Sequence, residues 1–189
     1  MKQNIFLISL FSLILIISIS SCNNDTLPKP KAQLRLEYSE PIYQNTQSNC
    51  PYLFQFSKQA ISKINSKCWV NIDYPELNAS INITYRPVKN NLKELFQESE
   101  KLTFNHSIKA DNISSVPFEN FNNKTYGAIF RVSGNAASPI QFHLTDSTKH
   151  FLTGAVYFNV KPNYDSILPA VNYLEKDIKH LMESLEWQN

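Results

Sequence analysis

A single apolar run at the N-terminus decides where the rest of this chain folds. Lys2 is followed by an almost uninterrupted apolar run over residues 5–17, and small residues then lead to Cys22. A cationic start, an apolar middle and a small-residue end are typical of a secretory signal peptide. A bilayer-spanning helix needs about 20 apolar residues, so the run is short for an uncleaved membrane helix, which is the alternative. The remainder of the chain is therefore expected to fold outside the cytoplasm.

The residues around Cys22 predict how the exported chain is held. The sequence Ile19-Ser20-Ser21-Cys22 resembles a bacterial lipobox, which implies cleavage before Cys22 and lipidation of its sulfur by acyl chains such as palmitate. Each acyl CH₂ buried in lipid contributes roughly 0.8 kcal/mol, so more than one chain holds a protein firmly. We expect a lipoprotein signal peptide over residues 1–21, a lipidated tether over 22–32 and a single α+β domain over 33–189.

The two other cysteines, Cys50 and Cys68, form an even pair in an exported chain. Cysteines outside the cytoplasm commonly pair as disulfides, and this spacing predicts one here. The alternative is a metal or redox pair. Against it, the two cysteines are far from a C-x-x-C spacing and no histidine lies near them in the sequence.

Alternating polar and apolar residues predict a chain built mainly of strands. The expected strands cover residues 33–38, 52–56, 69–74, 79–85, 113–118, 126–132, 140–145 and 151–160. Two amphipathic stripes predict helices. One helix is expected to begin at Asn90 or Asn91, and the other near Asp165, with Pro169 in its first turn.

The order of these elements predicts the fold class. Consecutive strands joined by short turns favour antiparallel pairing. The expected fold is therefore α+β, with a mainly antiparallel sheet covered by two amphipathic helices. This order of elements is similar to that of the PsbP/Mog1-like fold.

Composition excludes several classes of function. The formal net charge of +2 leaves no basic excess to hold a nucleic-acid backbone. The three glycines, Gly127, Gly134 and Gly154, are too widely spaced for a dinucleotide fingerprint or a P-loop. We expect neither a cofactor nor a metal ion.

The candidate catalytic region is the polar turn between His143 and His150. A hydrolase centred on His143, Asp146 and His150 would need the base beside its nucleophile, and the sequence offers no nucleophile elbow. The two histidines could instead hold a metal, although they lack further ligands at suitable spacing. The paired carboxylates Glu175 and Asp177 are expected on the solvated side of a helix. The chain is therefore predicted not to be an enzyme.

One short triplet recurs along the chain, consisting of an aspartate, then serine or threonine, then an apolar residue or threonine. It resembles the O-glycosylation motif of exported proteins of the Bacteroidota. The candidate hydroxyls are Thr26, Ser147 and Ser166. The alternative is chance together with helix capping, which accounts well for Asp165-Ser166.

Several longer stretches resemble one known family, the gliding motility lipoprotein GldD family of the Bacteroidota. They comprise residues 50–52, 68–75, 83–88, 109–111, 134–142, 145–151 and 161–166. The resemblance implies a cell-envelope lipoprotein that supports gliding and the type IX secretion machinery. It implies other gliding or secretion proteins as partners, and it brings no catalytic residues. The residues Asn23-Asn24-Asp25 lack an acidic run of the kind that resembles a surface-export signal, so we expect a periplasm-facing anchor.

The polar residues within these stretches have two interpretations. They are either a surface that contacts a partner protein or a set of turn and cap residues, as expected between strands and before a helix. The residues concerned are Asn135, Ser138, Asp146, His150, Lys161, Asn163 and Asp165. A different class of function, a small-ligand or glycan binder that uses an aromatic sheet face, is the alternative to protein binding.

Overall fold

A hairpin of alternating residues forms the centre of the fold. The computed structural model describes residues 38–105, 110–160 and 163–188. Strand β5 (Val70–Tyr74) and strand β6 (Ala79–Pro87) pair antiparallel. Every second side chain of β5 is buried, as are Ala79, Ile81 and Ile83 of β6. A short 3₁₀ turn (Pro75–Leu77) joins them and ends at Asn78, whose left-handed φ of 50° asparagine tolerates well. The predicted hairpin at this position is confirmed.

Five further strands extend this hairpin into a seven-stranded sheet in which every pairing is antiparallel. The order across the sheet is β4 (Ile61–Ile64), β5, β6, β10 (His150–Phe158), β9 (Ile140–Thr145), β8 (Thr125–Gly134) and β7 (Ala110–Asn120). The α+β class and the mainly antiparallel sheet are confirmed.

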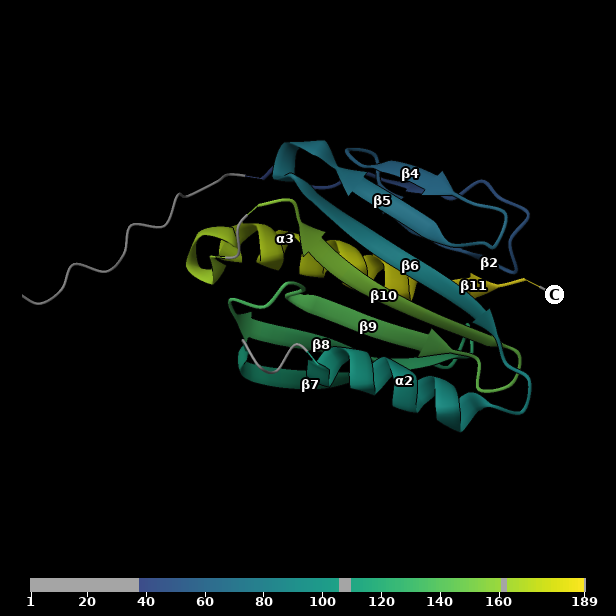
Figure 1. Cartoon of the computed structure of the whole chain (residues 1–189). Coiled ribbons are helices and arrows are strands. Elements are labelled where there is room, and N and C mark those ends of the chain that lie inside the picture. Colours follow the sequence, from purple (N-terminus) through teal and green to yellow (C-terminus); the bar gives the residue numbers. More distant parts are fainter. Residues whose placement is uncertain (1–37, 106–109, 161–162, 189) are drawn as a thin grey trace, which may run out of the picture. The chain divides into compact units, whose positions relative to one another are not determined.

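One face of the sheet carries the main core under a long helix. Helix α3 (Tyr164–Glu183) lies behind the sheet in Figure 1 and buries Val171, Leu174 and Ile178 completely. Side chains of the central strands meet this helix, because alternate residues of a strand share one face. The inward residues of β9, for example, include Ile140 and Phe142.

The opposite face is covered only in part. Helix α2 (Leu92–Asn105) lies in front of the lower strands in Figure 1. Its Phe96 ring packs edge-on against His143 of β9 and Phe151 of β10. The same face of β4, β5 and β6 lies beyond the helix, and Ile61 on β4 is 54% exposed. The two helices therefore pack on opposite faces, and part of one face carries no helix.

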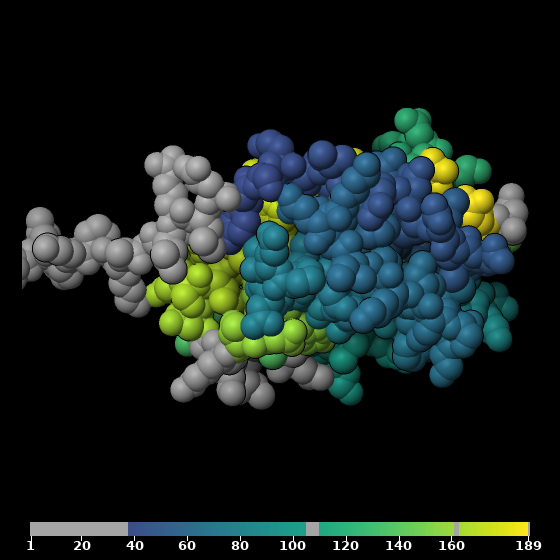
Figure 2. Space-filling model, turned by 90° about the horizontal axis from the view of Figure 1, so that it is seen from above, coloured from purple at the N-terminus to yellow at the C-terminus, as the bar shows by residue number. Residues whose placement is uncertain are grey.

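Two further pairs of short strands lie outside the seven-stranded sheet. Strand β1 (Tyr43–Asn45) pairs with β3 (Gln55–Ser57), and the C-terminal β11 (Glu186–Trp187) pairs with β2 (Tyr52–Leu53). Figure 2 shows residues 38–90, coloured purple to teal, over most of the side seen from above. The first predicted strand, 33–38, lies outside the described residues except for Tyr38, which is not in a strand.

The disulfide between Cys50 and Cys68 is present, which confirms that prediction. Their Cα atoms lie 5.6 Å apart, within the usual range for a bridge. Cys68 has a left-handed φ of 57°, and its carbonyl accepts a hydrogen bond from the Tyr52 hydroxyl at 2.5 Å. The bridge thus fixes the segment before β5 to the segment before β2.

Two details of α3 differ from expectation. The helix begins at Tyr164, so Pro169 lies inside it rather than in its first turn. The prediction that Asp177 faces solvent is wrong, because its side chain is 3% exposed. It accepts hydrogen bonds from the hydroxyls of Tyr43 (2.9 Å) and Tyr74 (3.0 Å), and so ties β1 and β5 to the helix. Burial raises the pKa of Asp177, although the two tyrosine hydrogen bonds partly offset that effect.

Candidate functional site

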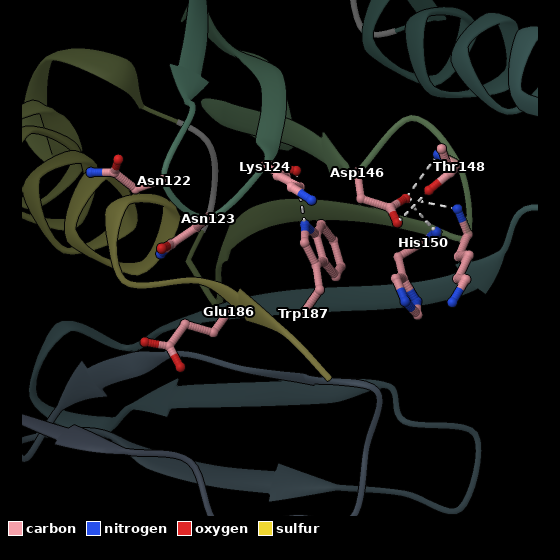
Figure 3. A pocket seen from close by; sticks show the side chains of 9 residues that line it. Asn122, Asn123, Lys124, Asp146, Thr148, His150, Glu186 and Trp187 are labelled. Atoms are coloured by element: carbon pink, nitrogen blue, oxygen red, sulfur yellow. Dashed lines mark hydrogen bonds between the residues drawn. The ribbon is translucent and has the colours of Figure 1, made fainter. Parts of the chain in front are cut away.

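A cavity opens at one end of the sheet, where two turns and the C-terminal strand meet. Its volume is about 530 Å³, and its walls come from the β7–β8 turn, the β9–β10 turn and the C-terminal β11. Figure 3 shows the side chains that line it. We call this region the loop end and define it by Asn122, Asn123, Lys124, Asp146, Thr148, Lys149, His150, Glu186 and Trp187.

Asp146 builds one wall by organising the β9–β10 turn. Its Oδ1 accepts the backbone N–H groups of Thr148 (3.0 Å), Lys149 (2.8 Å) and His150 (2.8 Å). The Thr148 hydroxyl donates to Oδ2 at 2.8 Å. Burial alone would raise the pKa of Asp146, but these hydrogen bonds outweigh burial and lower it. The aspartate therefore acts as a turn residue, as one of the two predicted interpretations requires.

An aromatic pair forms the floor of the cavity. The imidazole of His150 stacks on the indole of Trp187, with ring centroids 5.1 Å apart and an interplanar angle of 9°. The His150 Nδ1 lies 3.0 Å from the Tyr85 hydroxyl. Burial lowers the pKa of His150, although the nearby Asp146 carboxylate partly offsets that effect. The Trp187 indole N–H donates to the Lys124 carbonyl at 3.3 Å, which fixes the ring between two loops.

The β7–β8 turn holds the C-terminal segment in place beside the cavity. The Asn123 side-chain amide donates to the Leu185 carbonyl at 2.8 Å, and that of Asn120 donates to the Glu183 carbonyl at 3.2 Å. These bonds satisfy carbonyls at the end of α3, where the helix itself supplies no donors. The position of Trp187 therefore depends on a turn more than 60 residues earlier.

Two lysines and one glutamate give the loop end its exposed charges. Lys124 and Lys149 are exposed, and neither forms an ion pair with another described residue. Glu186 contributes one exposed carboxylate. The aromatic floor therefore lies beside two ammonium groups that form no ion pair within the described part of the chain.

The predicted polar surface divides between the two ends of the sheet. Asp146 and His150 lie at the loop end. The others that the structure describes lie at the opposite end, near the start of α3, where Asn135 accepts the Tyr164 N–H at 3.1 Å. There Ser138 is fully buried and donates to the Ile140 carbonyl at 3.1 Å, and Asn163 flanks the helix start.

Asp165 and Lys161 are the remaining members of the polar set. Asp165 is exposed in the first turn of α3, where its negative charge interacts favourably with the positive end of the helix dipole. Lys161 lies outside the described residues. The six members that the structure describes therefore do not form one continuous surface, and of these six only Asp146 and His150 line the cavity.

The hydrolase hypothesis is wrong in its geometry. His143 pairs with Thr153 of β10, and both side chains point to the face that carries α2. His150 is three residues before Thr153 on β10, so its side chain points to the opposite face, where it contacts Tyr85 and Trp187. His143 is 5% exposed, and burial lowers its pKa to about 4. A shared metal site is excluded by the same geometry, and no cluster of metal ligands occurs within the described residues.

The glycosylation candidates are placed only in part. Ser147 and Ser166 are both exposed, and the Ser166 hydroxyl donates to the Asn163 carbonyl at 2.9 Å. Thr26 lies outside the described residues, as does the lipidation candidate Cys22. Glycosylation at these positions stays a prediction.

Sequence reasoning missed the residues that complete the loop end. Trp187, Lys124 and Asn122 carry no motif, and the short β11 that places Trp187 is only two residues long. The one available signal was indirect, because a tryptophan beside the end of a predicted amphipathic helix is commonly anchored against a core. Trp187 does pack against the core cluster.

Comparison with known proteins gives one clear match. The family described as gliding motility lipoprotein GldD matches residues 23–187. No curated protein matches the chain. Among the described residues, no helix has the length and apolar character needed to cross a bilayer.

Proposed function

The chain belongs to the gliding motility lipoprotein GldD family, and from this premise we propose that it supports gliding by binding other envelope proteins. The proposal includes the type IX secretion machinery as the assembly it serves. Membership of a lipoprotein family indicates a membrane-anchored envelope protein. The proposed anchor is Cys22, after removal of residues 1–21, with the folded domain facing the periplasm.

A binding role rather than catalysis is proposed because the polar groups of the cavity are already engaged in structure. The Asp146 carboxylate accepts four hydrogen bonds within its own turn, and the His150 imidazole is stacked and paired with Tyr85. A general base needs a free lone pair within reach of its substrate. Neither group offers the arrangement of an activated nucleophile and base.

The loop end is the proposed contact surface. The observation that carries this proposal is the convergence of three chain segments on a fixed indole. Lys124 and Lys149 lie beside it and form no ion pair with any residue that the structure describes. Tryptophan anchors in partly enclosed pockets dominate the binding energy of many interfaces, and loops on a rigid sheet commonly carry such contacts. We expect the partner to present an acidic patch to the two lysines.

Reversing both charges tests the contact. The double variant Lys124→Glu/Lys149→Glu is expected to weaken partner binding roughly 100-fold, because like charges then face each other across the interface. The measurement is colony spreading and secretion in a strain that carries only the variant, with the membrane level of the protein followed by immunoblot. We expect spreading to be lost while the protein level stays normal.

The matched control is Lys93→Glu/Lys101→Glu on α2, which makes the same charge change at exposed positions outside the loop end. This control is expected to spread like the wild type. Normal spreading by the loop-end variant would reject the proposed contact, as would an equal loss in both variants.

A further inference from the structure

We propose that the part of the sheet left uncovered by α2 is a second binding site, which takes a neutral oligosaccharide. Two adjoining hollows lie on this face, one of about 440 Å³ beside Trp69 and one of about 190 Å³ beside α2. Both are lined by Asn82 and Thr84 of β6, so they meet at these two residues. We call the combined hollow the sheet groove.

The floor of the sheet groove is polar but almost uncharged. The side chains of β5, β6 and β10 that point to this face include Asn71, Asn82, Thr84 and Thr153. Among the residues that the structure describes, Lys63 is the only lysine, arginine or acidic residue that lines either hollow. Amide and hydroxyl groups suit the hydroxyls of a sugar, which both donate and accept hydrogen bonds. An anionic ligand would find little compensation here.

Aromatic and apolar side chains stand at the two ends of the groove. Trp69 is 42% exposed, and its indole N–H donates to the Tyr85 carbonyl at 3.2 Å, which holds the ring in place. At the other end Tyr157 is 36% exposed and Leu102 of α2 is 58% exposed. Exposed aromatic rings provide an apolar surface for the C–H face of a sugar ring. The Lys67 ammonium lies 5.1 Å from the centroid of the Trp69 ring and covers part of it.

The hollow beside α2 is lined by a buried glutamine whose amide nitrogen has no acceptor among the described residues. Gln141 is 7% exposed and lines this hollow, and its Oε1 accepts the Thr103 hydroxyl at 3.0 Å. Its Nε2 has no acceptor among the described residues. A buried donor left unpaired costs about 1–3 kcal/mol, so native proteins rarely keep one without a reason. A ligand hydroxyl in the hollow would supply the missing acceptor.

The shape of the site favours a sugar over an added peptide strand. The floor is the face of a sheet whose strands β5, β6 and β10 are each paired on both sides, so their backbone groups are already used. A peptide that binds as an extra strand needs a free edge. Neighbouring strands lie about 4.8 Å apart, so the path from β5 across β6 and β10 to β9 is about 14 Å long. This length accommodates a short linear oligosaccharide.

The test is an NMR titration of the full chain in detergent micelles, with ¹⁵N label on the tryptophan indoles and glutamine amides. The probes are uncharged linear trisaccharides of glucose, mannose, galactose and N-acetylglucosamine, with an uncharged hexapeptide as the competing ligand class. We expect at least one trisaccharide to shift the Trp69 indole and Gln141 amide signals and to leave the Trp187 indole unmoved. Trp69→Ala is expected to weaken that binding at least tenfold.

The control variant is Phe121→Ala, which removes a more exposed aromatic ring (71%) outside the sheet groove and should leave binding unchanged. A second variant, Ala155→Arg, fills the floor without removing a ring and should also abolish binding. The proposal is overturned if no trisaccharide shifts these signals, if the peptide binds instead, or if Phe121→Ala weakens binding as much as Trp69→Ala. None of these outcomes bears on the loop end, which is tested by spreading.

Discussion

Replacing both Cys50 and Cys68 with alanine is expected to lower the free energy of unfolding by about 3 kcal/mol. The bridge closes a loop between cysteines that are 18 residues apart, and its removal lets the unfolded chain explore many more conformations. A loss of this size is a large fraction of the 5–15 kcal/mol that typically stabilises a domain. Urea unfolding of the variant and of the oxidised wild type at the same pH measures the difference.

The control for this prediction is chemical reduction. Wild-type protein treated with a thiol reductant should lose a similar amount of stability, and the double variant should not respond to the reductant. A variant as stable as the oxidised wild type would contradict the assigned role of the bridge. It would mean that hydrogen bonds such as Tyr52 hydroxyl to Cys68 carbonyl hold these two segments without it.

Acidification is expected to destabilise the protein through His143. The ring lies among Phe96, Phe130 and Phe151, and burial lowers its pKa from 6.5 to about 4. The unfolded chain therefore binds a proton more readily than the folded chain, so the stability present above pH 6.5 is lost as pH falls towards 4. The shift corresponds to about 3 kcal/mol, because each pKa unit is worth about 1.36 kcal/mol.

The variant His143→Phe isolates this contribution, since a phenyl ring keeps the apolar contacts and does not titrate. The difference in unfolding free energy between wild type and variant should change by about 3 kcal/mol between pH 7 and pH 4. Lowered pKa values at Asp146 and His150 act in the same direction, and the raised pKa of Asp177 opposes them. These groups remain in both proteins and cancel in the difference. Parallel pH profiles would contradict a buried neutral His143.

Local patterns predicted the larger elements and failed for the short ones. Alternation identified β5, β6, β8, β9 and β10 because each is long enough to show its period. Strands β1 and β4 escaped because three or four residues carry too little pattern. The likeness to the PsbP/Mog1-like fold stays a prediction.

Helical spacing, and not polarity, determines which side of α3 Asp177 occupies. The residue lies three positions after Leu174 and four before Leu181, so helical spacing places it on the apolar stripe. Polarity alone had assigned it to the solvated side. Its two hydroxyl donors, Tyr43 and Tyr74, come from strands more than 100 residues earlier, and no local pattern could have paired them with it.

The β9–β10 turn is the one part of the candidate site that local sequence predicted. Asp146 was correctly seen as a turn former, because its side chain bonds to nearby backbone groups. The cavity itself requires Trp187, whose strand pairs with β2 at Tyr52, more than 130 residues earlier in the chain. The polar set had two interpretations, a partner surface or a set of turn and cap residues, and its local sequence does not show which end of the sheet each member occupies. Strands β9 and β10 instead carry Asn135 and Asp146 to opposite ends of the sheet.

Photo-crosslinking in living cells tests the central claim, that the loop end contacts an envelope partner. A photoreactive residue placed at Lys149 is compared with the same residue at Lys101 on α2, in strains that both glide normally. We expect irradiation to produce a discrete covalent adduct with another envelope protein from position 149 and none from position 101. Identical background patterns from the two positions would contradict the account.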